Sequence, residues 1–129
     1  MLLGCHLFNL IFIFALVLQS TPTVSDSSNA HIKMSTQLSV EFEVFGKVQR
    51  VAFRKYTQKK AVALGLTGWC QNTSHETVIG VVQGPKDAVE EMKEWLQTMG
   101  SPSSRIDHVV FKNESTISFT SYTHFDIRP

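Results

Sequence analysis

Residues 38–65 read LSVEFEVFGKVQRVAFRKYTQKKAVALG, and the change of period inside this stretch decides the fold. Through residues 38–44 apolar and polar side chains alternate, which is the two-residue period of a strand with one buried face. The alternation stops at Gly46. Residues 53–64 are then rich in helix formers and are followed by Gly65, which is typical of the position after a helix. The stretch therefore predicts a strand, a short loop and a helix.

The rest of the chain continues this order of strands and helices. Residues 66–72 and 76–84 have the composition of two strands, and the three residues between them are few enough for a hairpin. Within residues 85–100, apolar residues recur with helical spacing at Val89, Met92, Leu96 and Met99. β-Branched and aromatic residues then predict a strand at 107–117 and a short terminal strand at 125–128.

The predicted elements form one α+β domain. Their order is strand, helix, strand, strand, helix, strand, with a short extra edge strand at the C-terminus. Each helix has one apolar stripe to bury, so we expect both helices to pack on one face of an antiparallel sheet, in a ferredoxin-like βαββαβ sandwich. A chain of 129 residues, of which 43% are hydrophobic, has room for one such domain.

Composition gives little support for a metal site or for a large charged partner. The net charge is +1, so the charge balance does not favour nucleic acid or stable membrane association, and we expect a monomer. The five His residues are scattered, no zinc or Walker-type motif occurs, and the two Cys residues cannot form a disulfide framework. We expect no metal and no cofactor.

Residues 1–33 differ from the rest and are interpreted as an N-terminal leader. An apolar run at 7–18 precedes a stretch rich in Ser, Thr and Asn, as in a secretory signal, although no Lys or Arg precedes the run. The run is too short to cross a bilayer comfortably. Met34 offers an alternative start, so residues 34–129 are the predicted domain, and residues 1–33 are a signal peptide, a short anchor or untranslated.

The segment between the first strand and the first helix concentrates positive charge. Of the 12 Lys and Arg residues, half lie between Lys47 and Lys60, with no acidic residue among them. A loop that enters a helix presents unpaired N–H groups and the positive end of the helix dipole, so it favours phosphate. Arg54 can donate a bidentate pair of hydrogen bonds to phosphate oxygens. For Lys55, Lys59 and Lys60, the preferred interpretation is a solvated helix face.

Four motifs together resemble the acylphosphatase family. They are GKVQRVAFRKYTQ (46–58), GLTGWCQNT (65–73), VVQGP (81–85) and GSPSSRID (100–107). The resemblance covers residues 38–129 with unbroken spacing. It implies a small, metal-independent hydrolase that cleaves the carboxyl–phosphate bond of a small-molecule acyl phosphate, giving a carboxylate and inorganic phosphate.

The resemblance also implies roles for individual residues. Arg54 matches the arginine that binds the substrate phosphate, and Asn72 matches the asparagine that orients the attacking water. The matching phosphate-binding loop consists of Gly46, Lys47, Val48, Gln49, Arg50 and Val51. An acyl phosphate is already activated, so it needs charge stabilisation and water placement more than a strong nucleophile. No side-chain base is evident near either residue, and we infer that the phosphate accepts the proton of the water.

Arg50 departs from the family pattern. The family loop normally reads VQGV, and here it reads VQRV. If the position has φ > 0, a side chain costs on the order of 1 kcal/mol or changes the shape of the loop. This leaves an alternative function, a catalytically weak or silent acylphosphatase-like module that binds phosphorylated ligands or partners.

Two N-glycosylation sequons bear on localisation, one beginning at Asn72 and one at Asn113. A glycan on Asn72 would remove the proposed water-positioning amide. We therefore expect the active domain to be cytoplasmic and to start at Met34, with the secretory pathway as the alternative if the leader is a used signal peptide.

Four further side chains are interpreted as structural. Cys70 is expected to be a small buried residue rather than a nucleophile. Phe42, Trp69 and Trp95 are expected to pack in the core.

Overall fold

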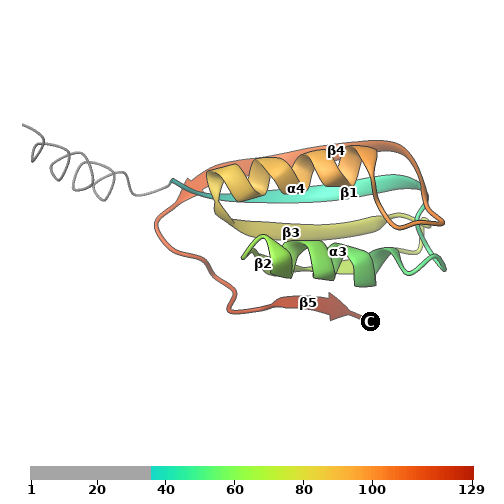
Figure 1. Cartoon of the computed structure of the whole chain (residues 1–129), viewed down its shortest axis with the longest axis horizontal. Helices are drawn as coiled ribbons and strands as arrows, with labels where there is room; N and C mark the ends of the chain where they lie inside the picture. Colours follow the sequence, from blue (N-terminus) through green and yellow to red (C-terminus); the bar gives the residue numbers. More distant parts are fainter. Residues whose placement is uncertain (1–35) are drawn as a thin grey trace, which may run out of the picture. The chain divides into compact units, whose positions relative to one another are not determined.

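The computed structural model describes residues 36–129 and confirms the predicted α+β fold (Figure 1). The elements in chain order are β1 (Gln37–Lys47), α3 (Phe53–Ala63), β2 (Thr67–Asn72), β3 (Val78–Pro85), α4 (Lys86–Thr98), β4 (Arg105–Ile117) and β5 (Phe125–Arg128). Within residues 36–129, no helix is long and apolar enough to cross a membrane. The predicted leader lies outside the described residues.

The sheet has five strands in the order β4-β1-β3-β2-β5. The pairs β1–β3, β1–β4 and β2–β3 are antiparallel, as expected for a ferredoxin-like fold. The terminal strand β5 occupies an edge as predicted, and it runs parallel to β2, so the five-stranded sheet as a whole is mixed. A parallel pair of strands requires a long connection. Here the connection from β2 to β5 includes β4, which lies at the opposite edge of the sheet.

The core lies between one face of the sheet and the two helices. Along β1 the burial alternates, and Val40, Phe42 and Val44 are fully or almost fully buried. Helix α4 contacts β1, β3 and β4, whereas α3 contacts β2 and β5. Burying apolar area in this layer supplies the main favourable free energy of folding. The division places the first turn of α3 beside the end of β2 and the C-terminal strand.

Trp69 does not pack in the core, contrary to the sequence-based expectation. Its neighbours Gly68 and Cys70 are buried, and because side chains alternate along a strand, the indole lies on the sheet face opposite to theirs. There it is half-buried, with the Arg128 guanidinium 4.0 Å from the ring centroid. Phe42 is buried as expected, and Trp95 packs partly buried against the core.

A glycine is required at position 46 because β1 and β4 pack closely there. It belongs to β1, next to a shift in the β1–β4 register between Phe45 and Gly46. Its φ of 134° lies outside the range that side chains tolerate, and a Cβ there would overlap the carbonyl oxygen of Arg105. The glycine thus allows β4 to approach the start of the loop between β1 and α3.

We predict that Gly80→Ala lowers the free energy of unfolding by about 1–3 kcal/mol, the usual cost of overfilling a packed core. A Cβ at position 80 would overlap the Trp69 carbonyl oxygen and the Phe42 ring. Urea unfolding of the full chain measures the change. Val62→Ala is the matched control, because Val62 is 62% exposed and its truncation should change stability by no more than about 0.5 kcal/mol. Equal stability of Gly80→Ala and wild type would contradict this packing.

Candidate active site

The loop between β1 and α3 brings unpaired backbone donors to the start of the helix. Ala52 caps α3 in the left-handed conformation (φ 56°, ψ 26°), and no side chain caps the helix. Tyr56 N donates to Ala52 O at 3.1 Å and begins the helical hydrogen-bond pattern. The N–H groups of the preceding residues of the first turn have no helical acceptor, and no acidic residue lies in that turn. This helix terminus favours an anion.

The backbone of Arg50 is left-handed, with φ 64°. A side chain in this conformation costs on the order of 1 kcal/mol of backbone strain. With Ala52 two residues later, the loop contains two left-handed residues that are not glycine. Turn geometry of this kind lets successive N–H groups converge into a concave surface that binds anions.

Arg54 and Asn72 line one cavity of about 270 Å³. Its complete lining is Val48, Arg50, Ala52, Phe53, Arg54, Lys55, Asn72 and Ile127. Three of these residues are cationic and none is acidic. The cavity therefore combines the helix terminus, a guanidinium and a carboxamide in an electropositive environment.

Hydrogen bonding to the last strand positions the side chain of Arg54. Arg54 Nη1 donates to the carbonyl oxygen of Arg128 at 2.8 Å, so β5 supports the guanidinium from one side. The residue is half-buried, and its other donors remain available for a ligand. Beneath it, Cys70 Sγ lies 3.7 Å from the Arg54 carbonyl oxygen. Burial raises the pKa of the Cys70 thiol to about 12, although the nearby Arg54 charge opposes this rise.

Asn72 ends β2 on the same face of the sheet as Cys70, because the two residues are two positions apart in a strand. Its Oδ1 atom is buried and accepts no hydrogen bond from the residues that the structure describes. Leaving a buried acceptor unpaired costs about 1–3 kcal/mol, so such an atom is expected to be used by a ligand or a water molecule. The carboxamide therefore has spare hydrogen-bonding capacity at the edge of the cavity.

Gln49 links the loop to the turn that follows Asn72. Its Nε2 atom donates to Thr73 O at 2.9 Å and to Thr77 O at 3.0 Å. Thr77 Oγ1 in turn donates to Glu43 Oε2 at 2.6 Å and lies 2.7 Å from Thr73 Oγ1. The side chain of Gln49 is thus used to hold the loop against the β2–β3 connection, which fixes the position of the loop relative to Asn72.

The six predicted loop residues all line a second, neighbouring cavity, and two of them also line the cavity of Arg54 and Asn72. These two are Val48 and Arg50. The neighbouring cavity, of about 430 Å³, is lined by Gly46, Lys47, Val48, Gln49, Arg50, Val51, Glu76 and Ser103. Sequence reasoning missed four lining residues of the cavity of Arg54 and Asn72, namely Ala52, Phe53, Lys55 and Ile127. The helix terminus could have indicated the first three, whereas no local signal placed the C-terminal strand here.

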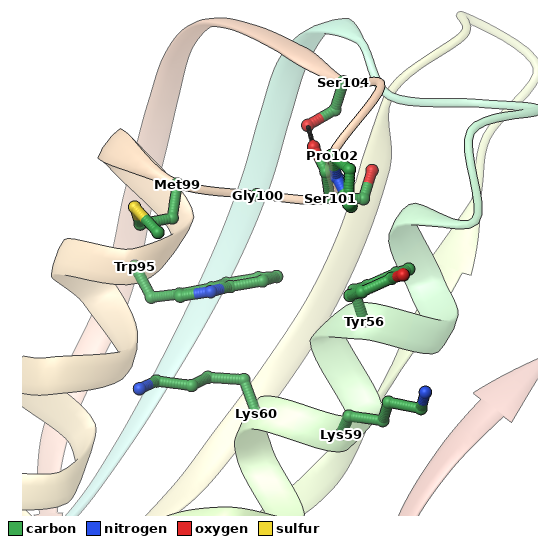
Figure 2. A pocket seen from close by; sticks show the side chains of 9 residues that line it. All are labelled: Tyr56, Lys59, Lys60, Trp95, Met99, Gly100, Ser101, Pro102 and Ser104. Carbon is green, nitrogen blue, oxygen red and sulfur yellow. Dashed lines mark hydrogen bonds between the residues drawn. The ribbon is translucent and has the colours of Figure 1, made fainter.

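A furrow of about 530 Å³ lies elsewhere, between α3, α4 and the loop after α4 (Figure 2). Tyr56 and Trp95 extend into it from the two helices. Two cations line it, Lys59 and Lys60, and Lys60 is paired with Glu91, with Nζ 3.2 Å from Oε2. The furrow contains neither Arg54 nor Asn72, so it is separate from the candidate site.

Comparisons with known proteins indicate the family to which the chain is similar. The Acylphosphatase family model matches residues 40–127. Acylphosphatase-2 of Homo sapiens is 57% identical over 90 residues, which cover 70% of this chain and 91% of that protein. Acylphosphatase-1 of Gallus gallus is 54% identical over 91 residues, covering 70% and 92%. The solved acylphosphatase of Coxiella burnetii has a TM-score of 0.65 and 34% identity, covering 74% of this chain and 99% of its own.

We predict that the stability of the protein falls between about pH 9 and pH 12 because of Cys70. The folded pKa is raised from the ordinary value of 9.0 to about 12, so the contribution of the neutral thiol is complete below pH 9 and is lost as the pH rises. Cys5, the other cysteine of the chain, is replaced in both variants so that only Cys70 differs. Urea unfolding of Cys5→Ser and of Cys5→Ser/Cys70→Ala across this pH range measures the loss of stability. The variant with Cys70 should lose more stability, and parallel pH profiles would contradict the assignment.

Proposed function

The chain belongs to the acylphosphatase family, and we propose that Arg54 and Asn72 carry out its hydrolysis of acyl phosphates. The enzyme cleaves the carboxyl–phosphate bond without a metal and releases a carboxylate and inorganic phosphate. The observation that supports the assignment is the single cavity shared by the guanidinium of Arg54, the carboxamide of Asn72 and the N-terminus of α3. All of these groups come from one chain, so we take the monomer as the active unit, and activity per chain should not depend on protein concentration.

The phosphoryl group binds at the N-terminus of α3. Backbone N–H groups of the loop and of the first helical turn donate to its oxygens, and Arg54 adds a charged, planar pair of donors. Its bond to the Arg128 carbonyl oxygen keeps the guanidinium in place before the substrate arrives. Donors that are already oriented stabilise the charge of the transition state without reorganisation during the reaction.

Asn72 orients the attacking water. Its unpaired Oδ1 accepts a hydrogen bond from that water, which leaves a water lone pair directed at phosphorus. The network of Gln49, Thr73 and Thr77 keeps the carboxamide and the phosphate loop at a fixed separation. The rate enhancement therefore comes from position rather than from activation by a strong base.

The proton of the water is transferred to the substrate itself. As the oxygen of the water bonds to phosphorus, the bond from phosphorus to the acyl oxygen breaks, and the carboxylate leaves with the electron pair. A carboxylate is a weak base and needs no general acid. No acidic residue lines the cavity, and Cys70 has its pKa raised to about 12, so a phosphate oxygen is the available acceptor.

Kinetic measurements can distinguish the proposed roles of Arg54 and Asn72. Arg54→Ala should weaken binding of inorganic phosphate and also lower turnover, because the guanidinium contacts both substrate and transition state. Asn72→Ala should lower turnover by about 100-fold or more while phosphate binding is largely kept, as expected for a group that acts through water. Hydrolysis of benzoyl phosphate by the full chain in the presence of a chelator, with phosphate as a competitive inhibitor, measures both effects. Unchanged kinetics in both variants would remove the assignment.

We also propose that the active protein is cytoplasmic and starts at Met34. Two observations support this. The Asn72 side chain lines the cavity, so a glycan there would occupy the site, and the free thiol of Cys70 is buried.

Intact-mass analysis of protein from its native cells tests this localisation. The expected product begins at or near Met34 and has an unmodified Asn72. A glycan on Asn72 would show that this pool of the protein is secretory and inactive.

A further inference from the structure

The cavity of Arg54 and Asn72 has more cationic side chains than its assigned tasks use. Arg50, Arg54 and Lys55 all line it, and no carboxylate does. Among residues 36–129, none of the three takes part in an ion pair. Arg54 and the backbone donors serve the phosphoryl group, so the charges of Arg50 and Lys55 remain without a partner.

Arg50 occupies a distinctive position among these cations. It is exposed and lines both the cavity of Arg54 and the neighbouring cavity, so it marks the edge at which the two meet. Its backbone is left-handed at φ 64°, a conformation that lets successive loop N–H groups converge. A guanidinium in this place can reach a group that is bound beside the phosphate.

The charge distribution further restricts where that group binds. Glu76 lines the neighbouring cavity but not the cavity of Arg54. Lys47 lines the neighbouring cavity too, so Glu76 offsets one of the two cations there. The cavity of Arg54 has three cations and no carboxylate, so a second anionic group is favoured most at the shared edge, where it faces Arg50. Guanidinium groups bind carboxylate and phosphate through paired, planar hydrogen bonds, which Lys cannot form.

We propose that Arg50 recognises a second anionic group on the acyl part of the substrate. The preferred substrates are then acyl phosphates that carry an additional carboxylate or phosphate. The inference rests on the proposed function, since it assigns a substrate class to the same site. Arg50 is then a specificity-determining residue whose exposed guanidinium binds the second anionic group of the substrate.

The test compares two substrates that differ by one charge, benzoyl phosphate and 4-carboxybenzoyl phosphate. The para position keeps the second carboxylate from attacking the acyl group within the same molecule. The full chain is assayed as wild type, Arg50→Gln and Arg50→Lys, and the ratio of the two kcat/KM values is measured. Any change in loop strain or phosphate binding affects both substrates and cancels in this ratio.

Arg50→Gln should lower the ratio by about two- to fivefold, the range of a partly exposed ion pair. Arg50→Lys should keep part of the preference, because it retains the charge but not the planar fork. Lys59→Gln is the matched control. It removes one charge from the exposed face of α3, outside the cavity, and should leave the ratio unchanged. The wild-type preference should also decrease as salt is added.

The outcomes separate this inference from the proposed function. If both substrates are hydrolysed and the ratio is the same in wild type and Arg50→Gln, the role of Arg50 is wrong while the hydrolase assignment remains. If the wild type hydrolyses neither substrate, both proposals fail. Turnover of benzoyl phosphate by Arg50→Gln itself shows that the variant is folded.

Discussion

The site depends on the pair of hydrogen bonds from Gln49 to the carbonyl oxygens of Thr73 and Thr77. Arg54 lies in the first turn of α3, and Asn72 is the last residue of β2. Nothing in the local chain sets the distance between these two elements. Gln49 connects the loop that leads into the helix with the turn that leaves the strand. Because backbone oxygens accept both bonds, the link restrains the frame of the site rather than one mobile side chain.

A second support comes from the end of the chain. The carbonyl oxygen of Arg128 accepts a bond from Arg54, and the guanidinium of Arg128 covers Trp69 on the opposite face of β2. The same residue thus holds β5 against β2 and positions the side chain of Arg54. The short terminal strand therefore supports the candidate site, although it contributes only Phe125 to the core.

The sequence predicts those features that depend on local period and composition. Alternation along β1, helix-forming residues from Phe53 and the hairpin between β2 and β3 are all encoded within a few neighbouring residues, and each was found. Sequence reasoning missed the parallel pairing of β5, its contact with Arg54 and the position of Trp69 on the sheet face away from the core. These features depend on contacts between residues far apart in the sequence, and a strand pattern does not state its direction or its partner. Phosphate binding by Arg54 was indicated by its place at the start of a helix in a basic segment, whereas the role of Asn72 came from the family resemblance.

The two helices differ in how they begin, and the difference supports a functional reading of the loop. Helix α4 begins after Pro85 and has Asp87 in its first turn, which offsets the positive end of its dipole. Helix α3 has no acidic residue in its first turn and begins after a left-handed alanine. Neither helix is capped by a side chain. Near this terminus lie a strained Arg50 and the unpaired oxygen of Asn72. Unfavourable features that gather around one cavity are expected where a bound anion and its water can satisfy them together, since the same donors and acceptor that are unpaired without substrate become paired when it binds.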